Sequence, residues 1–277
     1  MKLGFSTNAF TEKSLLYAIK SISTIGYHGI EIVLDVPHLF LPITKYTLTT
    51  LKNAKKKYEI EITNLNSNTV EGWYRQKRHN IEKFEPSLSN NNDKFRKWRI
   101  NYTKKVIDLA HELNAPSVSI TSGIKASYSK PKNFSKLCTS LEEIATYAEK
   151  NDVQIAIEYE PGLLVENSND VLRLISNDFK NIGVNFDLCH AAVLDENIPH
   201  VIKKIGKKLY HTHISDCKNK KHYHLIPGDG EIDFIAFIRA LNAINYKGFL
   251  TGELYTYPKN PEFAATRTFF YLKKLVS

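Results

Sequence analysis

Short runs of β-branched and apolar residues alternate with longer amphipathic runs along the whole chain. The short runs predict strands, and each is followed by a segment whose apolar positions recur with the helical period. In segment 12–25, for example, Leu15, Ile19 and Ile22 fall on one face of a helix. Eight strands are predicted in this way, at 2–6, 29–33, 59–65, 117–121, 153–158, 182–187, 208–215 and 248–254.

The amphipathic runs predict helices at 12–25, 48–58, 93–113, 134–151, 168–176, 199–205, 233–244 and 261–276. Strands that alternate with helices form right-handed βαβ units and a parallel sheet. Eight such units in 277 residues predict an α/β protein with a (β/α)8 TIM barrel, as a single domain that spans residues 1–277. An open doubly wound sheet is the alternative, but no G-x-G-x-x-G motif follows the first strand.

Segment 66–92 interrupts this alternation with a long polar stretch that has no clear period. A structureless connection of this length is uncommon in a compact domain, and loops of this kind usually have a function. We therefore interpret the segment as a lid or an active-site loop.

Composition narrows the class of protein. With 42% hydrophobic and 24% charged residues, the chain has the composition of a folded globular protein. No apolar run approaches the roughly 20 residues that a membrane span needs, and the N-terminus lacks the apolar core of a secretory signal. Cys138, Cys189 and Cys217 are too few and too scattered for a disulfide framework. These features favour a cytoplasmic, reducing compartment and no membrane partner.

The charge balance bears on the ligands. A formal net charge of +9, from 38 Lys and Arg against 29 Asp and Glu, favours anionic ligands. The basic residues are spread along the chain rather than massed in one tail. This distribution favours a solvated lysine-rich surface over a nucleic-acid-binding patch.

Ionisable residues stand at the ends of the last four predicted strands, where the catalytic groups of a TIM barrel lie. They are Glu158, Asp187, His213 and Glu253. Three carboxylates and an imidazole at one buried rim repel one another and are costly to desolvate without a cation between them. Oxygen and nitrogen donors without a thiolate suit Mn²⁺, Mg²⁺, Co²⁺ or Zn²⁺. We therefore predict that these four residues bind one divalent metal ion.

Each of these residues also has a structural interpretation when taken alone. A carboxylate that ends a strand, such as Glu158 or Glu253, is usually a helix N-cap or a surface residue, and Asp187 could cap the following helix. The imidazoles of His190 and His211 could be hydrogen-bonded groups of the core. For Glu31 and Asp35, near the second strand, we expect a structural or solvent-facing role. Cys189 is expected to serve in packing.

Five sequence strings resemble the xylose isomerase-like TIM barrels, a superfamily that includes sugar and sugar-phosphate isomerases and epimerases and endonuclease IV. The strings are IAIEYEPG (155–162), GVNFDLCH (183–190), HTHISD (211–216), HYHLIPGDGEIDF (222–234) and TGELY (251–255). The resemblance implies that Glu158, Asp187, His213 and Glu253 are the metal ligands. It also implies that Glu158 and Glu253 are the catalytic acid and base, which move a proton while the metal stabilises an enediolate.

The same resemblance implies a small carbohydrate or sugar phosphate as substrate, and relatives that dimerise or tetramerise are compatible with a homo-oligomer. His190 matches a histidine that contacts substrate in the epimerases. Trp73, in the lid-like segment, could stack on a sugar face or belong to the core. Lys218, like Lys125 and Lys220, could meet a phosphate or be solvated. The expected substrate-binding residues are His190, His224, Glu160, Trp73 and Lys218.

A zinc nuclease is the main alternative. Nuclease-like members of the superfamily use three zinc ions and take extra histidines from the ends of strands three and four, but TNLNSNTVEGW and TSGIKAS contain none. A single-metal isomerase or epimerase is therefore favoured. His224 falls where the nuclease has a further zinc ligand and His222 where it has aspartate, so a second metal stays open. The third hypothesis is a non-catalytic or biosynthetic relative that binds another metabolite.

Overall fold

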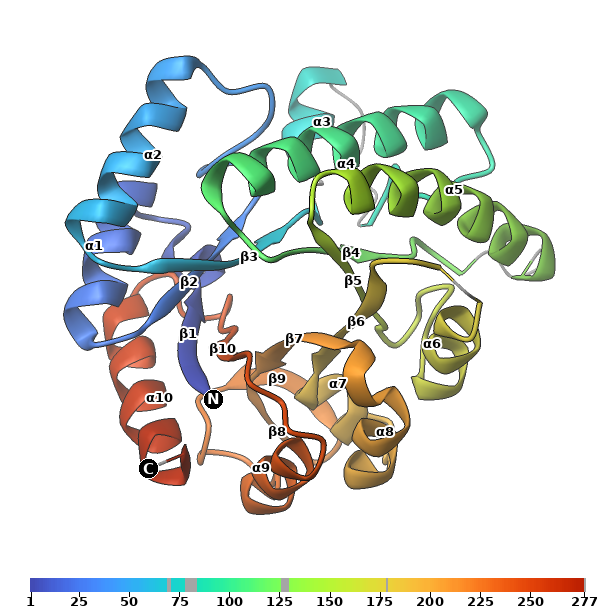
Figure 1. The fold of residues 1–277 in the computed structure, drawn as a ribbon. Coiled ribbons are helices and arrows are strands. Elements are labelled where there is room, and N and C mark those ends of the chain that lie inside the picture. The colour runs from blue at the N-terminus through green and yellow to red at the C-terminus, as the bar shows by residue number, and fades with distance from the viewer. Residues whose placement is uncertain (69–70, 78–83, 126–129, 178, 277) are drawn as a thin grey trace.

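Eight parallel strands close into a barrel in the computed structural model of this protein (Figure 1). Around the barrel each strand pairs with the next, and the last pairs with the first. The prediction of a (β/α)8 TIM barrel is confirmed. The barrel strands are β1 (Lys2–Ser6), β2 (Gly29–Val33), β3 (Glu61–Asn66), β4 (Ser117–Thr121), β5 (Gln154–Glu158), β6 (Ile182–Asp187), β7 (Leu209–Ile214) and β10 (Phe249–Gly252).

The structure describes residues 1–277 except 69–70, 78–83, 126–129, 178 and 277. The predicted lid, 66–92, therefore lies partly outside the described residues. Its described part contains the end of β3, a short helix α3 (Glu71–Lys77), and an irregular stretch at 84–92.

Helices surround the barrel and cover the outer face of its strands (Figure 1). Side-chain caps fix where several of them begin, because the first backbone N–H groups of a helix have no partner inside it. Ser14, for example, accepts from the N–H of Tyr17, and Asp233 accepts from that of Ala236. The helices of this ring are α1 (Leu15–Ile25), α2 (Lys45–Lys57), α4 (Asp93–Leu113), α5 (Lys130–Lys150), α6 (Ser168–Ile175), α8 (Ile198–Ile205), α9 (Phe234–Ala243) and α10 (Pro261–Val276).

Besides α3, four smaller features were not predicted. Two are 3-10 turns, at Thr7–Phe10 and Gly206–Lys208, and a third is helix α7 (Leu188–Val193). The fourth is an antiparallel hairpin of β8 (Asp216–Lys218) and β9 (Lys221–Leu225), which lies outside the barrel sheet. Its turn residues Asn219 and Lys220 both have positive φ, the backbone of a two-residue type I′ turn.

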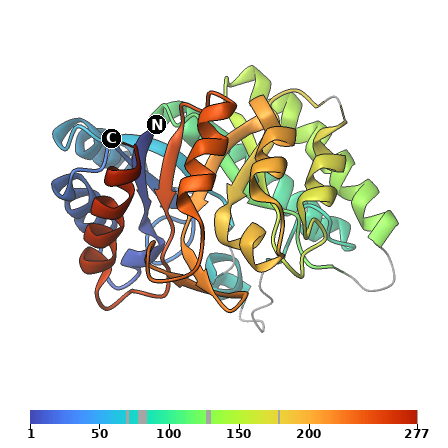
Figure 2. The ribbon, with the colours of Figure 1, turned by 90° about the horizontal axis from the view of Figure 1, so that it is seen from below.

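The amino and carboxyl ends of the strands lie at opposite ends of the barrel. Figure 2 shows the N-terminus at one end and the β8–β9 hairpin, drawn in orange, at the other. The hairpin follows β7 directly, so it stands over the carboxyl ends of the strands. Within the described residues, every helix is too short or too polar to pass through a lipid bilayer.

Candidate active site

Three carboxylates and one imidazole meet at the carboxyl ends of four neighbouring strands. Glu158 ends β5, Asp187 ends β6, His213 is the fifth residue of β7, and Glu253 follows β10. The register places Asp187 beside His213, and His213 beside Thr251 two residues before Glu253. One donor atom from each of the four residues lies within 4.8 Å of the others. The structure thus brings together the four residues that the sequence suggested as metal ligands.

The two ring nitrogens of His213 face different partners. Nδ1 lies 3.3 Å from Oε1 of Glu158 and 3.6 Å from Oε1 of Glu253. Nε2 lies 2.7 Å from Oε2 of Glu31, on the opposite side of the ring. Glu158 is held from behind by Asn185, whose Nδ2 donates to Oε2 of the carboxylate at 3.0 Å. This bond leaves Oε1 of Glu158 on the side of the imidazole.

Asp187 divides its two carboxylate oxygens between two roles. Oδ1 accepts from the N–H groups of Cys189 at 2.7 Å and His190 at 2.9 Å, and so caps the start of α7. Oδ2 is buried and has no hydrogen-bond partner within the described part of the chain. A buried carboxylate oxygen without a partner is costly. A divalent cation would satisfy it, and the surrounding oxygen and nitrogen donors fit such an ion.

The pKa values at the site reflect crowded charges. Burial, and to a smaller extent Glu158 and Asp187, raise the pKa of Glu253 well above its usual range, although His213 opposes this. Burial would lower the pKa of His213, but Glu253, Glu31 and Glu158 outweigh it and raise that pKa well above 6.5. Burial would likewise raise the pKa of Asp187, but nearby histidines hold it below its ordinary value. A bound cation would relieve the repulsion among these carboxylates.

Three further histidines line the rim next to this cluster. The ring of His222, from β9, stacks on that of His224, with 3.8 Å between the ring centroids. It forms a T-shaped contact with the ring of His190, with 4.6 Å between the centroids. Nδ1 of His190 is hydrogen-bonded to the carbonyl of Tyr159 at 2.8 Å, which leaves Nε2 for another partner. Burial and the neighbouring His222 lower the pKa of His224 to about 3, so it is neutral at pH 7.

The other residues expected to bind substrate differ in how far they are exposed. Glu160 is half-buried just beyond β5. Trp73 is only 7% exposed. Its ring centroid lies 4.2 Å from that of Trp98 and 5.8 Å from that of Phe95, so packing against helix α4 accounts for its burial. Lys218 is exposed at the end of β8.

The two other lysines considered for a phosphate form ion pairs. Lys125 lies 2.6 Å from Glu166, and Lys220 lies 2.9 Å from Asp195. Both pairs are partly or largely exposed, so water and salt screen them.

Glu31 corrects an expectation drawn from the sequence. A solvent-facing role is wrong, because the side chain is fully buried inside the barrel and contacts His213 and His211. The position of Glu31 in the sequence indicated this burial. Glu31 stands between Ile30 and Ile32 in a parallel strand, and such strands are buried on both faces. A carboxylate in that setting needs a partner in the interior. Asn185 was also missed, although it is likewise a buried polar residue between two apolar ones, on β6.

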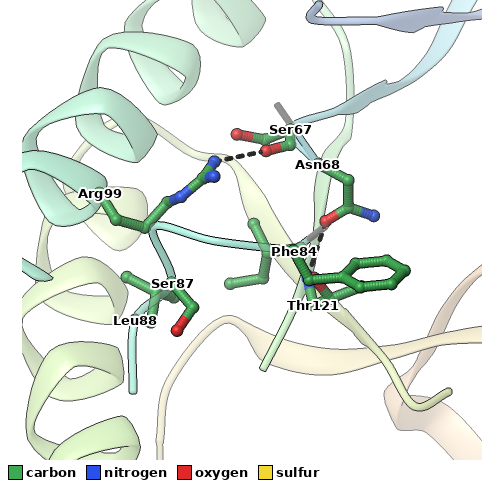
Figure 3. A pocket seen from close by; sticks show the side chains of 8 residues that line it. Ser67, Asn68, Phe84, Ser87, Leu88, Arg99 and Thr121 are labelled. Carbon is green, nitrogen blue, oxygen red and sulfur yellow. Dashed lines mark hydrogen bonds between the residues drawn. The ribbon is translucent and has the colours of Figure 1, made fainter. Parts of the chain in front are cut away.

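A small pocket lies beside the ends of β3 and β4, on the other side of the barrel mouth (Figure 3). Two of its polar side chains are bonded to neighbouring backbone groups. Arg99 donates to the carbonyl of Ser67 at 2.9 Å, and Asn68 accepts from the N–H of Thr121 at 2.9 Å. The cavity measures about 10 Å³, about enough for one water molecule and not for a sugar.

Comparison with known proteins relates this geometry to a family. The model of the family described as xylose isomerase-like TIM barrel matches residues 19–275. Fructoselysine 3-epimerase of Shigella flexneri is 27% identical over 264 residues, which cover 92% of this chain and 91% of the relative.

Solved structures share the fold at lower sequence identity. D-psicose 3-epimerase from Clostridium cellulolyticum H10, solved with D-tagatose, superposes with a TM-score of 0.80 at 19% identity and full coverage of both chains. An IolI protein with a bound zinc atom superposes with a TM-score of 0.81 at 21% identity, covering 100% of this chain and 98% of the other.

Proposed function

This chain belongs to the xylose isomerase-like TIM barrel family, and from that premise we propose that it is a divalent-metal-dependent isomerase or epimerase of a sugar or sugar phosphate. The observation that carries the proposal is the convergence of Glu158, Asp187, His213 and Glu253, with donor atoms within 4.8 Å of one another. The similarity to fructoselysine 3-epimerase over nearly the whole chain supports the same class of reaction.

The metal would be held by the oxygens of Glu158, Asp187 and Glu253 and by Nδ1 of His213, the nitrogen that faces the carboxylates. The unpartnered Oδ2 of Asp187 supports this assignment. When bound, a divalent ion supplies Lewis-acid stabilisation of the negative charge that develops on a substrate carbonyl oxygen.

Two carboxylates are available for proton transfer. Glu158 and Glu253 come from β5 and from the end of β10, with β6 and β7 between them in the barrel wall, so they approach the site from two sides. One carboxylate removes the proton from the carbon beside the carbonyl, and the electron pair of that C–H bond shifts toward the carbonyl oxygen. The other carboxyl group returns a proton to the opposite face of the same carbon, which gives the epimer. A proton returned to the former carbonyl carbon gives the isomer, when the proton of the neighbouring hydroxyl passes to the former carbonyl oxygen.

Two histidines of the rim would hold substrate hydroxyl groups in this proposal. His190 and His224 each use Nδ1 in a hydrogen bond to a backbone carbonyl, that of Tyr159 at 2.8 Å and that of Glu253 at 3.1 Å. In its neutral form each ring therefore keeps Nε2 as an acceptor, because its proton is on Nδ1. Glu160, Trp73 and Lys218 stay predictions as substrate-binding residues.

The decisive experiment incubates the Mn²⁺-loaded protein in D₂O with fructoselysine, D-fructose, D-psicose and D-tagatose, and with ketose phosphates. We expect at least one sugar to be converted to an epimer or isomer that carries deuterium at the carbon that exchanged its proton, read by NMR. The Asp187→Asn variant, which loses a charged metal ligand, serves as the control and should be inactive.

Two outcomes would contradict the proposal. Conversion without uptake of deuterium from the solvent would rule out proton transfer through solvent-exchangeable carboxyl groups. Binding of no divalent ion by the wild-type protein would remove the metal from the mechanism altogether.

A further inference from the structure

A second polar cluster lies beneath the candidate metal ligands, inside the barrel. Its centre is Glu31 on β2, whose Oε2 lies 2.7 Å from Nε2 of His213 and 3.2 Å from Nε2 of His211. Nδ2 of Asn64, on β3, donates to the same oxygen at 2.7 Å. All four side chains are 1% exposed or less. β2 and β7 are not neighbours in the sheet, so the contact between Glu31 and His213 crosses the barrel interior.

Asn64 bonds to Glu31 and to two serines. Its Oδ1 accepts from the hydroxyl of Ser117 at 2.8 Å, and its Nδ2 donates to the hydroxyl of Ser119 at 2.7 Å as well as to Glu31. The amide nitrogen, rather than the oxygen, therefore faces Glu31. An ionised carboxylate has no proton to donate, so Nε2 of His213, which approaches Oε2 of Glu31, must be the donor.

We propose that Glu31 is a positioning residue, which holds the proton of His213 on Nε2 and so leaves the lone pair of Nδ1 for the metal ion. This inference rests on the proposed function, because it concerns a ligand of that metal site. Two distances at opposite sides of the His213 ring support this role: Nε2 is 2.7 Å from Oε2 of Glu31, and Nδ1 is 3.3 Å from Oε1 of Glu158. A neutral imidazole carries one proton, so fixing it on one nitrogen frees the other.

Such a carboxylate behind a ligating histidine also fixes the angle of the ring and makes the imidazole a better donor. The arrangement explains why a fully buried carboxylate stands in the middle of β2, between two isoleucines that pack in the core. Three residues that are far apart in the sequence, Glu31, Asn64 and His213, are thus combined into one support for the metal site.

The test measures Mn²⁺ affinity by titration calorimetry for the wild type, for Glu31→Gln and for Glu85→Gln. Glu85 is the matched control, because it is also a buried glutamate, 7% exposed, but bonds to Ser87 and Asn90 near the end of β4 rather than to His213. We expect Glu31→Gln to bind Mn²⁺ about 10- to 100-fold more weakly, as removal of a carboxylate behind a ligating histidine usually does. Glu85→Gln should bind like the wild type.

A second measurement does not depend on a variant that folds. In the wild type labelled with ¹⁵N at histidine and loaded with Zn²⁺, long-range ¹H–¹⁵N spectra should show the proton of His213 on Nε2 and the metal on Nδ1. The opposite assignment would overturn the proposal. So would a Glu31→Gln variant with the wild-type affinity and a normal thermal unfolding curve. A wild-type protein that binds neither ion refutes the proposed function as well, and the two failures are thereby distinguished.

Discussion

The two sides of the barrel mouth use buried carboxylates in opposite ways. On the side of β2 to β4, both oxygens of Asp35 accept backbone N–H bonds, from Val36 and Gly72 on Oδ1 and from Glu71 on Oδ2. Glu85 likewise bonds to neighbouring groups through both oxygens. On the side of β5, β6, β7 and β10, Glu158, Asp187 and Glu253 crowd around one imidazole, and an oxygen of Asp187 has no partner in the described chain.

This difference separates structural from functional carboxylates. A carboxylate whose oxygens all accept N–H bonds has its charge satisfied by the fold and holds a loop or a helix in place. Carboxylates that face each other without donors raise the free energy of the protein until a cation binds. Burial alone does not distinguish the two groups, since Asp35 and Asp187 are both buried.

The largest expected effect comes from removing a carboxylate of the crowded side. We expect Glu253→Gln, and separately Glu158→Gln, to lower turnover by about 10²- to 10⁴-fold, because each loses a proton-transfer group. Turnover of the best substrate from the sugar panel checks this. Glu166→Gln is the control, since Glu166 pairs with Lys125 at the surface. Undiminished turnover in Glu253→Gln would exclude that residue from the mechanism.

The second largest effect should come from removal of the metal. Mn²⁺ at 100 times its dissociation constant should stabilise the folded protein by about 2.7 kcal/mol, because it binds the folded state alone. Thermal unfolding with Mn²⁺ and after treatment with a chelator measures the change. Asp187→Asn should melt at the same temperature under both conditions. An equal shift in wild type and variant would mean that the ion binds elsewhere.

A substitution on the other side should affect the fold without affecting the metal. Asp35→Ala leaves the backbone N–H groups of Glu71 and Gly72, at the start of α3, without their acceptor. We expect a loss of about 1–3 kcal/mol in the free energy of unfolding, the usual cost of unpaired buried donors. Denaturant unfolding measures it. Mn²⁺ affinity should stay at the wild-type value, and a large drop in affinity would break the proposed division between the two sides.

The smallest expected effect is on the pH dependence of stability, through a histidine on the β2 side. Burial lowers the pKa of His38 below its ordinary value of 6.5, although hydrogen bonds to the carbonyls of Phe10 and Lys13 oppose this. The unfolded chain therefore binds a proton at this position more readily than the folded one. The stabilisation is present above pH 6.5 and is lost as the pH falls through the folded pKa. His38→Gln should show a weaker fall in unfolding free energy between pH 7.5 and pH 5 in urea titrations, and an unchanged fall would exclude His38 as the source.

Most of the architecture could be predicted because it follows from local periodicity. Four barrel strands, 2–6, 29–33, 117–121 and 182–187, and the helices 93–113 and 261–276 have the predicted bounds. The other barrel strands begin and end within about two residues of prediction. Helix α7 and the β8–β9 hairpin were missed because six or fewer residues per element give no measurable period. Asp187 could be interpreted from sequence as a cap or as a ligand, and the structure shows that one oxygen caps α7 while the other stays unpaired.

The alternation of eight strands with helices, and the ionisable residues at the strand ends, could be predicted from the chain alone, because both depend on neighbouring residues. Which side chains meet in the interior depends instead on how the strands are arranged in space. Glu31 and His213 are 182 residues apart and touch because the sheet closes into a barrel. Strand pairing in the sheet likewise brings one donor atom each of Glu158, Asp187, His213 and Glu253 within 4.8 Å of one another. These are long-range contacts, and no local pattern of hydrophobic and polar residues encodes them.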